Sequence, residues 1–421
     1  MRRSVVFLVS QFPRLSETFV VGQAAGVVRR GHELRILVFS DRPKTIGKTH
    51  AAVEQYDLLG RTSYLGKLPR GSRQRMFGIT RQLARHPGSW SLLCRSLVTP
   101  GHRPWPQGYL RATSIPDIGT PDIIHCQFGP LGLDALMLRD LLGWNAPLVC
   151  SFRGWDASSF IQRHGDRVYA ELFRRGDFFL PNCEHFRGRI VGLGCDPGKT
   201  AVLASGIDCQ LFSPSSGQRS GDPCLRLTTV GRLVEKKGIE FGLRMVATLV
   251  ARGIPVRYRI VGEGELRPAL QALIGQLKIA EHAQLLGEMN QTELLEVLRT
   301  TEVFVAPNVR ARDGNEDAPI NVLKEAMAME IPVLASRHGG IVELVEDGVS
   351  GRLAREGDPD DLTAKMLQLL ADRQQWPAMG RAGRRQVLEK FELETLNDQL
   401  LDYYEQAIAG YHAAKGRMRV A

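Results

Sequence analysis

Short apolar runs alternate with longer amphipathic stretches along the first half of the chain. Residues 5–9 and 34–39 are predicted buried strands, and the stretch between them is a predicted helix that Ser16 caps and Gly31 ends. A strand, a helix and a second strand within about 40 residues indicate a parallel α/β unit. Further buried strands are predicted at 122–125, 148–152 and 178–181.

The same pattern begins again after a stretch rich in Ser, Gly and Pro at 213–223, which we interpret as a linker. Strands are predicted at 225–230, 256–261, 303–306 and 332–335, and helices at 239–252, 266–277 and 320–329. The predicted fold is therefore α/β, with two doubly wound, Rossmann-like domains that face each other across a cleft. We place the N-terminal domain at 1–212, the second domain at 224–391 and the last helices at 392–421. Ligands of such sheets bind beyond the carboxyl ends of the strands.

The composition narrows the choice of partners and compartment. A net charge of +10 favours an anionic partner, such as nucleic acid, a phospholipid surface or a phosphorylated small molecule. The seven cysteines include no C-x-x-C pair, and their odd number argues against a disulfide framework and a structural zinc site. We therefore expect no metal and a cytoplasmic location. No apolar run is long enough to span a bilayer.

One segment, 61–111, has a distinct charge pattern. It contains no Asp or Glu, but it has ten Lys or Arg residues and five interleaved Trp, Tyr or Phe residues. One interpretation is a solvated insertion. The other, which we favour, is a peripheral contact with the inner membrane, because basic residues bind anionic lipid and aromatic rings favour the interface.

Most of the motifs that carry chemistry follow predicted strands of the second domain. Asp317 and Glu325 stand eight positions apart, one in the loop before the helix 320–329 and one inside it. A carboxylate beside an apolar helix face needs hydrogen-bond donors, and sugar hydroxyls would provide them. The alternative is that Asp317 caps the helix and Glu325 is a solvated edge residue.

Two further turns predict a phosphate site. Arg232 and Lys237, in Gly-Arg-Leu-Val-Glu-Lys-Lys-Gly after the strand 225–230, offer a guanidinium and an ammonium to phosphate oxygens. Gly339 and Gly340 follow the strand 332–335 and, with Ile341, begin a short helix whose N–H groups suit an anion. Together they predict a clamp for one diphosphate. In the first domain, the polar loop 10–19 is either a substrate contact or an ordinary capping loop.

These motifs together resemble those of the retaining glycosyltransferases of family four, which have the GT-B fold. The opening Phe-Pro-Arg-Leu-Ser-Glu-Thr-Phe at 12–19 is most similar to the colanic-acid and amylovoran type of exopolysaccharide glycosyltransferase. The resemblance implies a metal-independent transfer of a sugar from a nucleotide-diphosphate sugar to a saccharide acceptor, lipid-linked in this type, and no cofactor. It also implies that the helices at 392–421 cross back onto the first domain.

The resemblance assigns a role to each motif. Arg232 and Lys237 would hold the donor diphosphate, and Glu325 would bind the ribose hydroxyls. Asp317 would touch the transferred sugar. The backbone at Gly339, Gly340 and Ile341 would bind phosphate and sugar oxygens.

Two positions depart from the family pattern. The family has Glu where this chain has Asp317, so the adjacent Glu316 is an alternative sugar contact. Related sequences carry His in the first-domain motif where this chain has Arg153, which cannot act as a base but can hold a phosphate or a hydroxyl. His125, at the end of the strand 122–125, is either an acceptor-side catalytic residue or a hydrogen-bonded core histidine.

Two rival functions remain open at this point. One is a sugar-nucleotide epimerase or a phosphorylase on the same fold. The other is a non-catalytic, basic protein that binds nucleic acid or membranes. We expect no nucleic-acid partner, because the phosphate motifs are spaced for one small ligand.

Overall fold

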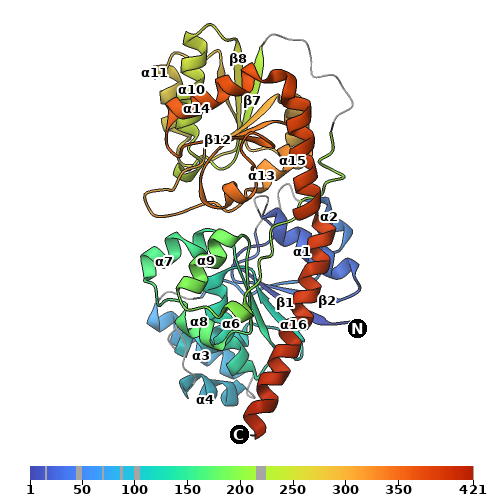
Figure 1. The fold of residues 1–421 in the computed structure, drawn as a ribbon. Helices are drawn as coiled ribbons and strands as arrows, with labels where there is room; N and C mark the ends of the chain where they lie inside the picture. Colours follow the sequence, from blue (N-terminus) through green and yellow to red (C-terminus); the bar gives the residue numbers. More distant parts are fainter. Residues whose placement is uncertain are drawn as a thin grey trace.

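The computed structural model describes residues 1–14, 17–43, 50–68, 71–85, 89–98, 105–214 and 224–420. It consists of two α/β domains stacked one above the other, with the N-terminal domain below in Figure 1. The predicted cap Ser16 and most of the predicted linker lie outside the described residues, as do Arg70 and Arg103 of the basic segment.

The N-terminal sheet has six parallel strands in the order β3-β2-β1-β4-β5-β6. They are β1 (Ser4–Val9), β2 (Glu33–Val38), β3 (Thr62–Tyr64), β4 (Ile123–Cys126), β5 (Leu148–Phe152) and β6 (Phe178–Pro181). β4, β5 and β6 are buried along their whole length, because helices cover both faces of a parallel sheet. The predicted strands match the observed ones, whereas β3 was not predicted.

The second sheet is also parallel, in the order β12-β11-β10-β7-β8-β9. Its strands are β7 (Leu225–Val230), β8 (Val256–Val261), β9 (Ala283–Gly287), β10 (Val303–Ala306), β11 (Val333–Ser336) and β12 (Gly351–Ala354). After β7 the chain adds β8 and β9 on one side of that strand, and it then adds β10, β11 and β12 on the other side. This reversal beside β7 makes a switch point, where such sheets bind ligands.

Helices cover the faces of both sheets. Those of the first domain are α1 (Thr18–Arg29), α2 (Ala51–Gln55), α3 (Ser72–Arg85), α4 (Trp90–Val98), α5 (Trp105–Thr113), α6 (Gly129–Leu142), α7 (Ser159–His164), α8 (Ala170–Arg175) and α9 (Glu184–Gly192). Those of the second part of the chain are α10 (Ile239–Ala251), α11 (Arg267–Gln276), α12 (Gln291–Arg299), α13 (Asn321–Ala328), α14 (Pro359–Ala371), α15 (Trp376–Lys390) and α16 (Leu393–Val420). The helix predicted at 320–329 is α13, and Ile320 is its N-cap.

The long helix α16 runs from the second domain down along the first (Figure 1). It packs against α1, and its buried Tyr404 reaches the core of the N-terminal domain. Where it begins, Glu392 forms a parallel bridge with Ile207 of the segment that leaves the first domain. The two segments that cross between the domains, one beside Ile207 and one beside Glu392, therefore lie side by side and join the domains at one edge.

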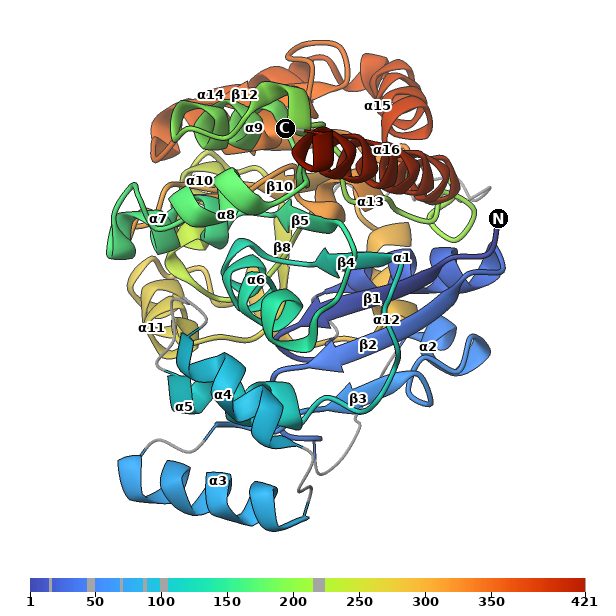
Figure 2. The same ribbon diagram turned by 90° about the horizontal axis from the view of Figure 1, so that it is seen from below.

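The basic segment forms three of the helices, α3, α4 and α5. The view from below shows α3 as the outermost helix of the N-terminal domain (Figure 2). α5 packs against both α3 and α6, so it connects this helical group to the rest of the domain. No helix in the described part of the chain combines the length and the apolar character that crossing a bilayer requires.

Candidate active site

The sequence motifs of the second domain meet at one edge of its sheet. β7, β10 and β11 are neighbours, and the turns that follow them carry Arg232 and Lys237, Asp317, and Gly339 with Gly340. Because the strands are parallel, all three turns lie at the same end of the sheet. This end faces the N-terminal domain.

Asp317 is the centre of this cluster. Its buried carboxylate accepts a hydrogen bond from the Lys237 ammonium at 2.8 Å and lies 2.8 Å from the Lys236 ammonium. The Asn308 amide donates to the same carboxylate at 2.6 Å. Burial by itself would raise the pKa of Asp317, but the two ammonium groups outweigh burial and hold this pKa far below its usual value. Asp317 is therefore ionised, and it fixes both lysines in place.

The glycine turn packs directly on Asp317. Gly339 has φ +48°, and a methyl group placed on it would lie 2.2 Å from the Asp317 carbonyl oxygen. The N–H of Gly340 donates to that same oxygen at 3.3 Å. A side chain at position 339 is excluded by both the backbone angle and the contact. Gly339 to Glu343 then form a short 3-10 helix, η5.

Glu325 lies on α13, the helix that follows the loop of Asp317. It is buried, and among the described residues no hydrogen-bond donor contacts its carboxylate. Burial raises the pKa of Glu325 to about 7, while the neighbouring Lys324 partly opposes the shift. A buried carboxylate without donors is costly to ionise, so it is suited to a ligand that brings hydroxyl donors. The alternative interpretation was wrong on both counts. Glu325 is buried rather than solvated, and the cap of α13 is Ile320 rather than Asp317.

Lys324 anchors α13 on its other side. Its ammonium donates to the Ser205 carbonyl at 2.7 Å and lies 4.7 Å from the centre of the Phe391 ring. Ser205 and Phe391 belong to the two chain crossings between the domains. Burial lowers the pKa of Lys324 to about 7. The helix that carries Glu325 is thus fixed to the two segments that cross between the domains.

Glu316, next to Asp317, points the other way, towards the N-terminal domain. Its carboxylate is 2.8 Å from the His185 ring nitrogen and 3.1 Å from the Arg189 guanidinium, both on α9. Burial would raise the pKa of Glu316, but the hydrogen bonds from His185 and Arg189 outweigh it and lower the pKa to about 2. Of the two adjacent acidic residues, only Asp317 therefore faces the lysines and the glycine turn.

A second contact between the domains lies beside the first. The Glu343 carboxylate accepts the backbone N–H groups of Glu184 and His185 at 2.9 and 2.8 Å. These groups begin α9, and the carboxylate satisfies helix N–H donors that have no partner within the helix. Glu316 and Glu343 together form an interdomain latch on α9.

Arg232 is exposed and lies between the two domains. It lies close enough to Lys237 in its own domain and to Glu17 in the facing domain for its charge to act on both. Burial raises the pKa of Glu17, and the positive charges of Arg14, Arg153 and Arg232 oppose this shift. Glu17 belongs to the opening motif, where Thr18 accepts a hydrogen bond from Asn321 of α13 at 3.2 Å. The loop 10–19 therefore meets the second domain at the cluster of motifs.

Arg153 and His125 lie deeper in the N-terminal domain. The Arg153 guanidinium donates to the Gln127 side chain at 2.7 Å and to Gln23 at 3.0 Å, and it stacks 4.3 Å from the Phe19 ring. Burial lowers the pKa of Arg153 to about 10, so it stays charged near neutral pH.

His125 is fully buried. Its two ring nitrogens lie 2.7 Å from the Tyr404 hydroxyl and 2.9 Å from the Ser151 hydroxyl. Burial holds the pKa of His125 well below its usual value. This placement favours the core-histidine alternative, because neither nitrogen is turned to the cleft.

Comparison with known proteins assigns the chain to a family. The model of group 1 glycosyl transferases matches residues 220–386, and that of a glycosyl transferase 4-like domain matches residues 16–206. A protein of Escherichia coli K12 named as a colanic acid biosynthesis glycosyltransferase, WcaL, is 32% identical over 406 residues, which cover 94% of this chain and 98% of that protein. The chain is a group 1 glycosyltransferase.

Other relatives agree with this assignment. The amylovoran biosynthesis glycosyltransferase AmsK of Erwinia amylovora is 29% identical, over 96% of this chain and 99% of that protein. Among solved structures, Anabaena Alr3699/HepE in complex with UDP-glucose matches with a TM-score of 0.72 and 17% identity, over 96% of this chain and 100% of that one. Sucrose-phosphate synthase of Thermosynechococcus elongatus matches with a TM-score of 0.71 and 17% identity, over 97% and 100%. The GT-B fold and the family predicted from the motifs are confirmed.

This glycosyltransferase also has site residues that the motifs did not reveal. Lys236 was visible beside Lys237, but nothing in the sequence indicated that both ammonium groups bind Asp317. His185 and Arg189 belong to no recognised pattern, and only the packing of the two domains places them beside the cluster. Glu343 stands in the family-like stretch after the glycine turn, but nothing in the sequence indicated its contact with α9. The family assignment does not favour an epimerase, a phosphorylase or a non-catalytic basic protein.

Proposed function

We propose that this glycosyltransferase moves a sugar, with retention and without a metal ion, from a nucleotide-diphosphate sugar to a saccharide acceptor in exopolysaccharide biosynthesis. The observation that carries the proposal is the convergence of Arg232, Lys237, the Gly339 turn and Glu325 at one end of one sheet. The relatives named for colanic acid and amylovoran biosynthesis support the pathway.

Each group has a distinct task in this mechanism. Arg232 and Lys237 hold the diphosphate, and the N–H groups of the glycine turn bind its remaining oxygens. Lys236 keeps the Asp317 carboxylate in position for a hydroxyl of the transferred sugar. Glu325 accepts hydrogen bonds from the ribose. As the bond to the sugar breaks, negative charge grows on the leaving diphosphate, and these fixed cations stabilise it.

Retention requires the acceptor to attack the face of the sugar that the diphosphate leaves. Neither Asp317 nor Glu316 is free to act as a nucleophile, because Asp317 is held by two ammonium groups and Glu316 by α9. We therefore propose that the diphosphate departs and the acceptor attacks on the same face of the sugar. The first domain holds the acceptor close, and this positioning supplies much of the rate.

Screening of nucleotide diphosphates and their sugars by thermal shift tests the donor. The matching donor should raise the melting temperature, because a ligand at 100 times its Kd adds about 2.7 kcal/mol of stability. The shift and the transfer should persist in EDTA. If no nucleotide diphosphate or nucleotide sugar stabilised the protein, the proposed donor site would be wrong.

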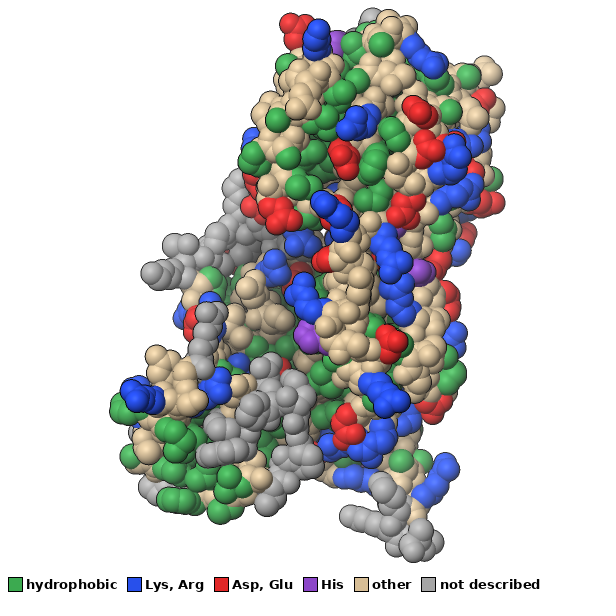
Figure 3. Space-filling view, turned by 90° about the vertical axis from the view of Figure 1, so that its left-hand side faces the viewer, with side chains coloured by type: hydrophobic (Ala, Val, Ile, Leu, Met, Phe, Trp, Pro, Cys, Tyr) green, Lys and Arg blue, Asp and Glu red, His purple; other side chains and the backbone are tan. Residues whose placement is uncertain are grey.

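We further propose that the enzyme works on a lipid-linked acceptor at the cytoplasmic face of the inner membrane. Support comes from large apolar side chains that are exposed on α3 and α4: Met76 (51%), Phe77 (69%), Trp90 (59%) and Leu97 (56%). Figure 3 shows hydrophobic and basic side chains together at the lower end of the N-terminal domain. Such a mixture suits an anionic bilayer surface.

Liposome co-sedimentation tests this contact. The double variant Phe77→Ser with Trp90→Ser should lose binding to vesicles that contain anionic lipid. Leu388→Ser removes an apolar side chain of similar exposure (41%) from the second domain, and it should bind like the wild type. Equal binding of all three proteins would rule out α3 and α4 as the membrane contact.

A further inference from the structure

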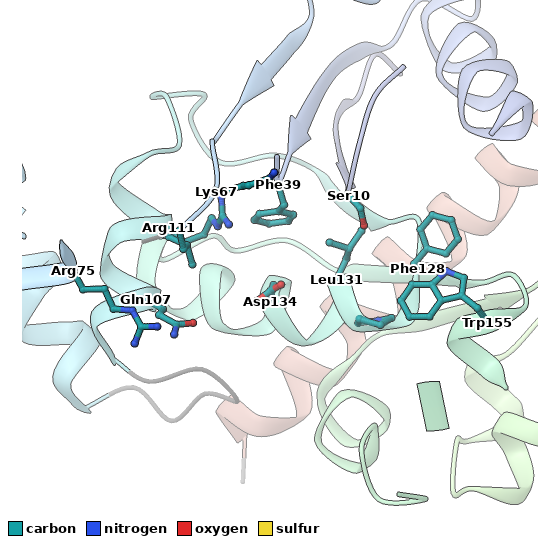
Figure 4. A pocket seen from close by; sticks show the side chains of 12 residues that line it. Ser10, Phe39, Lys67, Arg75, Gln107, Arg111, Phe128, Leu131, Asp134 and Trp155 are labelled. Carbon is teal, nitrogen blue, oxygen red and sulfur yellow. The ribbon is translucent and has the colours of Figure 1, made fainter. Parts of the chain in front are cut away.

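A pocket opens in the N-terminal domain where β1, β2 and β4 end (Figure 4). Its volume of about 430 Å³ lies in the range of small-molecule sites. Ser10, from the loop 10–19, and Trp155, from the motif of Arg153, line it, but most of its polar lining comes from the basic segment rather than from the donor cluster. Its chemistry differs between its two ends.

One end of the pocket is cationic. Lys67, Arg75 and Arg111 line it, and Asp134 is the one acidic residue of the described lining. The lining thus has an excess of two positive charges. Arg111 is buried, donates to the Gly66 carbonyl at 2.9 Å and stacks 4.5 Å from the Phe39 ring. A guanidinium held in this way is preorganised, so little entropy is lost when it binds an anion.

The other end of the pocket is aromatic. The rings of Phe128 and Trp155 lie 6.1 Å apart, and Trp155 is partly exposed. In Figure 4 these rings stand on one side and the cationic groups on the other, with Asp134 between them. Aromatic faces suit the apolar C–H face of a sugar ring, and the Asp134 carboxylate suits its hydroxyls.

The aromatic end adjoins the donor cluster. Trp155 follows Gly154, and a methyl group placed on Gly154 would lie 3.3 Å from the carbonyl oxygen of Glu316. Glu316 is the residue before Asp317. The aromatic end of the pocket therefore lies beside the loop that carries Asp317, and the cationic end lies away from it.

We propose that this pocket binds the acceptor and selects a saccharide that carries an oxyanion, a carboxylate or a phosphate, which Lys67, Arg75 and Arg111 hold. This inference rests on the proposed glycosyl transfer and adds the chemical class of the acceptor. The oxyanion comes either from an acidic sugar residue or from the diphosphate of a lipid carrier. The basic segment then forms one wall of the acceptor site.

The test compares three probes on the full chain saturated with the nucleotide diphosphate that the thermal-shift screen selects, so that the donor site is occupied. They are methyl α-D-glucoside, which is neutral, methyl α-D-glucuronide, which carries a carboxylate, and farnesyl diphosphate, which carries the lipid diphosphate. We expect at least one anionic probe to bind about tenfold or more tightly than the glucoside, the factor expected for one hydrogen bond to a charged group. Preference for the glucuronide assigns the oxyanion to a sugar, and preference for farnesyl diphosphate assigns it to the carrier.

Variants show whether these side chains cause the preference. Arg75→Gln and Lys67→Gln should each abolish it, whereas Arg111 is left unchanged because it is buried and donates to the Gly66 carbonyl. Arg81→Gln removes an exposed charge from the same helix outside the pocket, so it should keep the preference. The inference is overturned if the glucoside binds as tightly as both anionic probes, or if Arg75→Gln and Lys67→Gln both retain the preference.

The donor site provides an independent control. The selected nucleotide diphosphate should raise the melting temperature of the wild type and of Arg75→Gln equally. If neither UDP nor any other nucleotide diphosphate raised the melting temperature while the preference for anionic probes persisted, the proposed glycosyl transfer would be wrong. The proposed anion-binding pocket would still be supported.

Discussion

Binding of the sugar donor should depend on pH through Glu325. Burial raises the pKa of this carboxyl to about 7, from 4.5 in an exposed chain. Only the ionised form accepts hydrogen bonds from both ribose hydroxyls. Donor affinity should therefore rise as the pH passes through 7, whereas the nucleotide sugar itself stays fully ionised throughout.

The size of the effect follows from the ionised fraction. With a pKa of about 7, roughly a tenth of the protein carries the ionised carboxylate at pH 6 and about nine tenths at pH 8. Apparent affinity scales with that fraction, so the Kd should be about tenfold smaller at pH 8. Glu325→Gln should bind about 10- to 150-fold more weakly at pH 8, the loss expected for hydrogen bonds to a charged group, and it should show no slope.

The raised pKa of Glu325 has the opposite effect on the stability of the protein without donor. Between pH 4.5 and about 7 the unfolded carboxyl loses its proton and the folded one keeps it. The free energy of unfolding should therefore fall as the pH rises through this window, by up to about 3 kcal/mol from this group. Glu325→Gln removes this contribution, so without donor it should be more stable than the wild type at pH 8.

Isothermal titration calorimetry at pH 6, 7 and 8 measures the effect, with the best donor from the thermal-shift screen. Glu240→Gln is the matched control, because it removes an exposed carboxylate from the same domain. A wild-type Kd that stays constant from pH 6 to 8 would refute the reasoning. So would a slope that survives in Glu325→Gln.

Three further outcomes are expected. Lys237→Ala should reduce the donor-induced thermal shift strongly, since it removes a cation of the diphosphate clamp; Arg312→Ala, which removes a 92% exposed guanidinium nearby, should not, and equal shifts in both would count against the clamp. Glu343→Ala should favour an open arrangement of the domains, seen as a larger radius of gyration in solution scattering and a several-fold higher KM, while an unchanged radius would argue against the latch. His125→Ala should lower the free energy of unfolding by about 2–4 kcal/mol, because the Tyr404 and Ser151 hydroxyls lose their partner and a cavity opens; unchanged stability with lost turnover would instead assign His125 to the reaction.

The interior strands could be read from the sequence, and of the four edge strands only β6 could. β5, β6, β7 and β8 have the predicted bounds. β5 and β6 are nearly continuous apolar runs that are buried along their whole length, whereas β7 and β8 also carry arginines among their apolar residues. The strands without a prediction, β3, β9 and β12, all lie at sheet edges. β3 and most of β9 are only partly buried, so their composition does not separate them from loops.

The positions of the candidate site motifs likewise followed from local sequence. Each motif follows a buried strand, and parallel strands bring their carboxyl ends together, so Arg232, Lys237 and Gly339 had to meet at one edge. What the sequence left open was the partner of each charge. Asp317 and Glu316 are adjacent, yet one faces two lysines of its own domain and the other faces α9.

The sequence of this glycosyltransferase thus determined its two sheets, their motifs and its family, because burial and chain geometry act over a few residues. Only the tertiary structure decided that Glu316 and Glu343 latch the domains, that His125 is enclosed by Tyr404, and that the basic segment forms a wall of a pocket. Those contacts join residues far apart in the chain. The strength of a charge or a hydrogen bond depends on the neighbours and the burial that folding supplies.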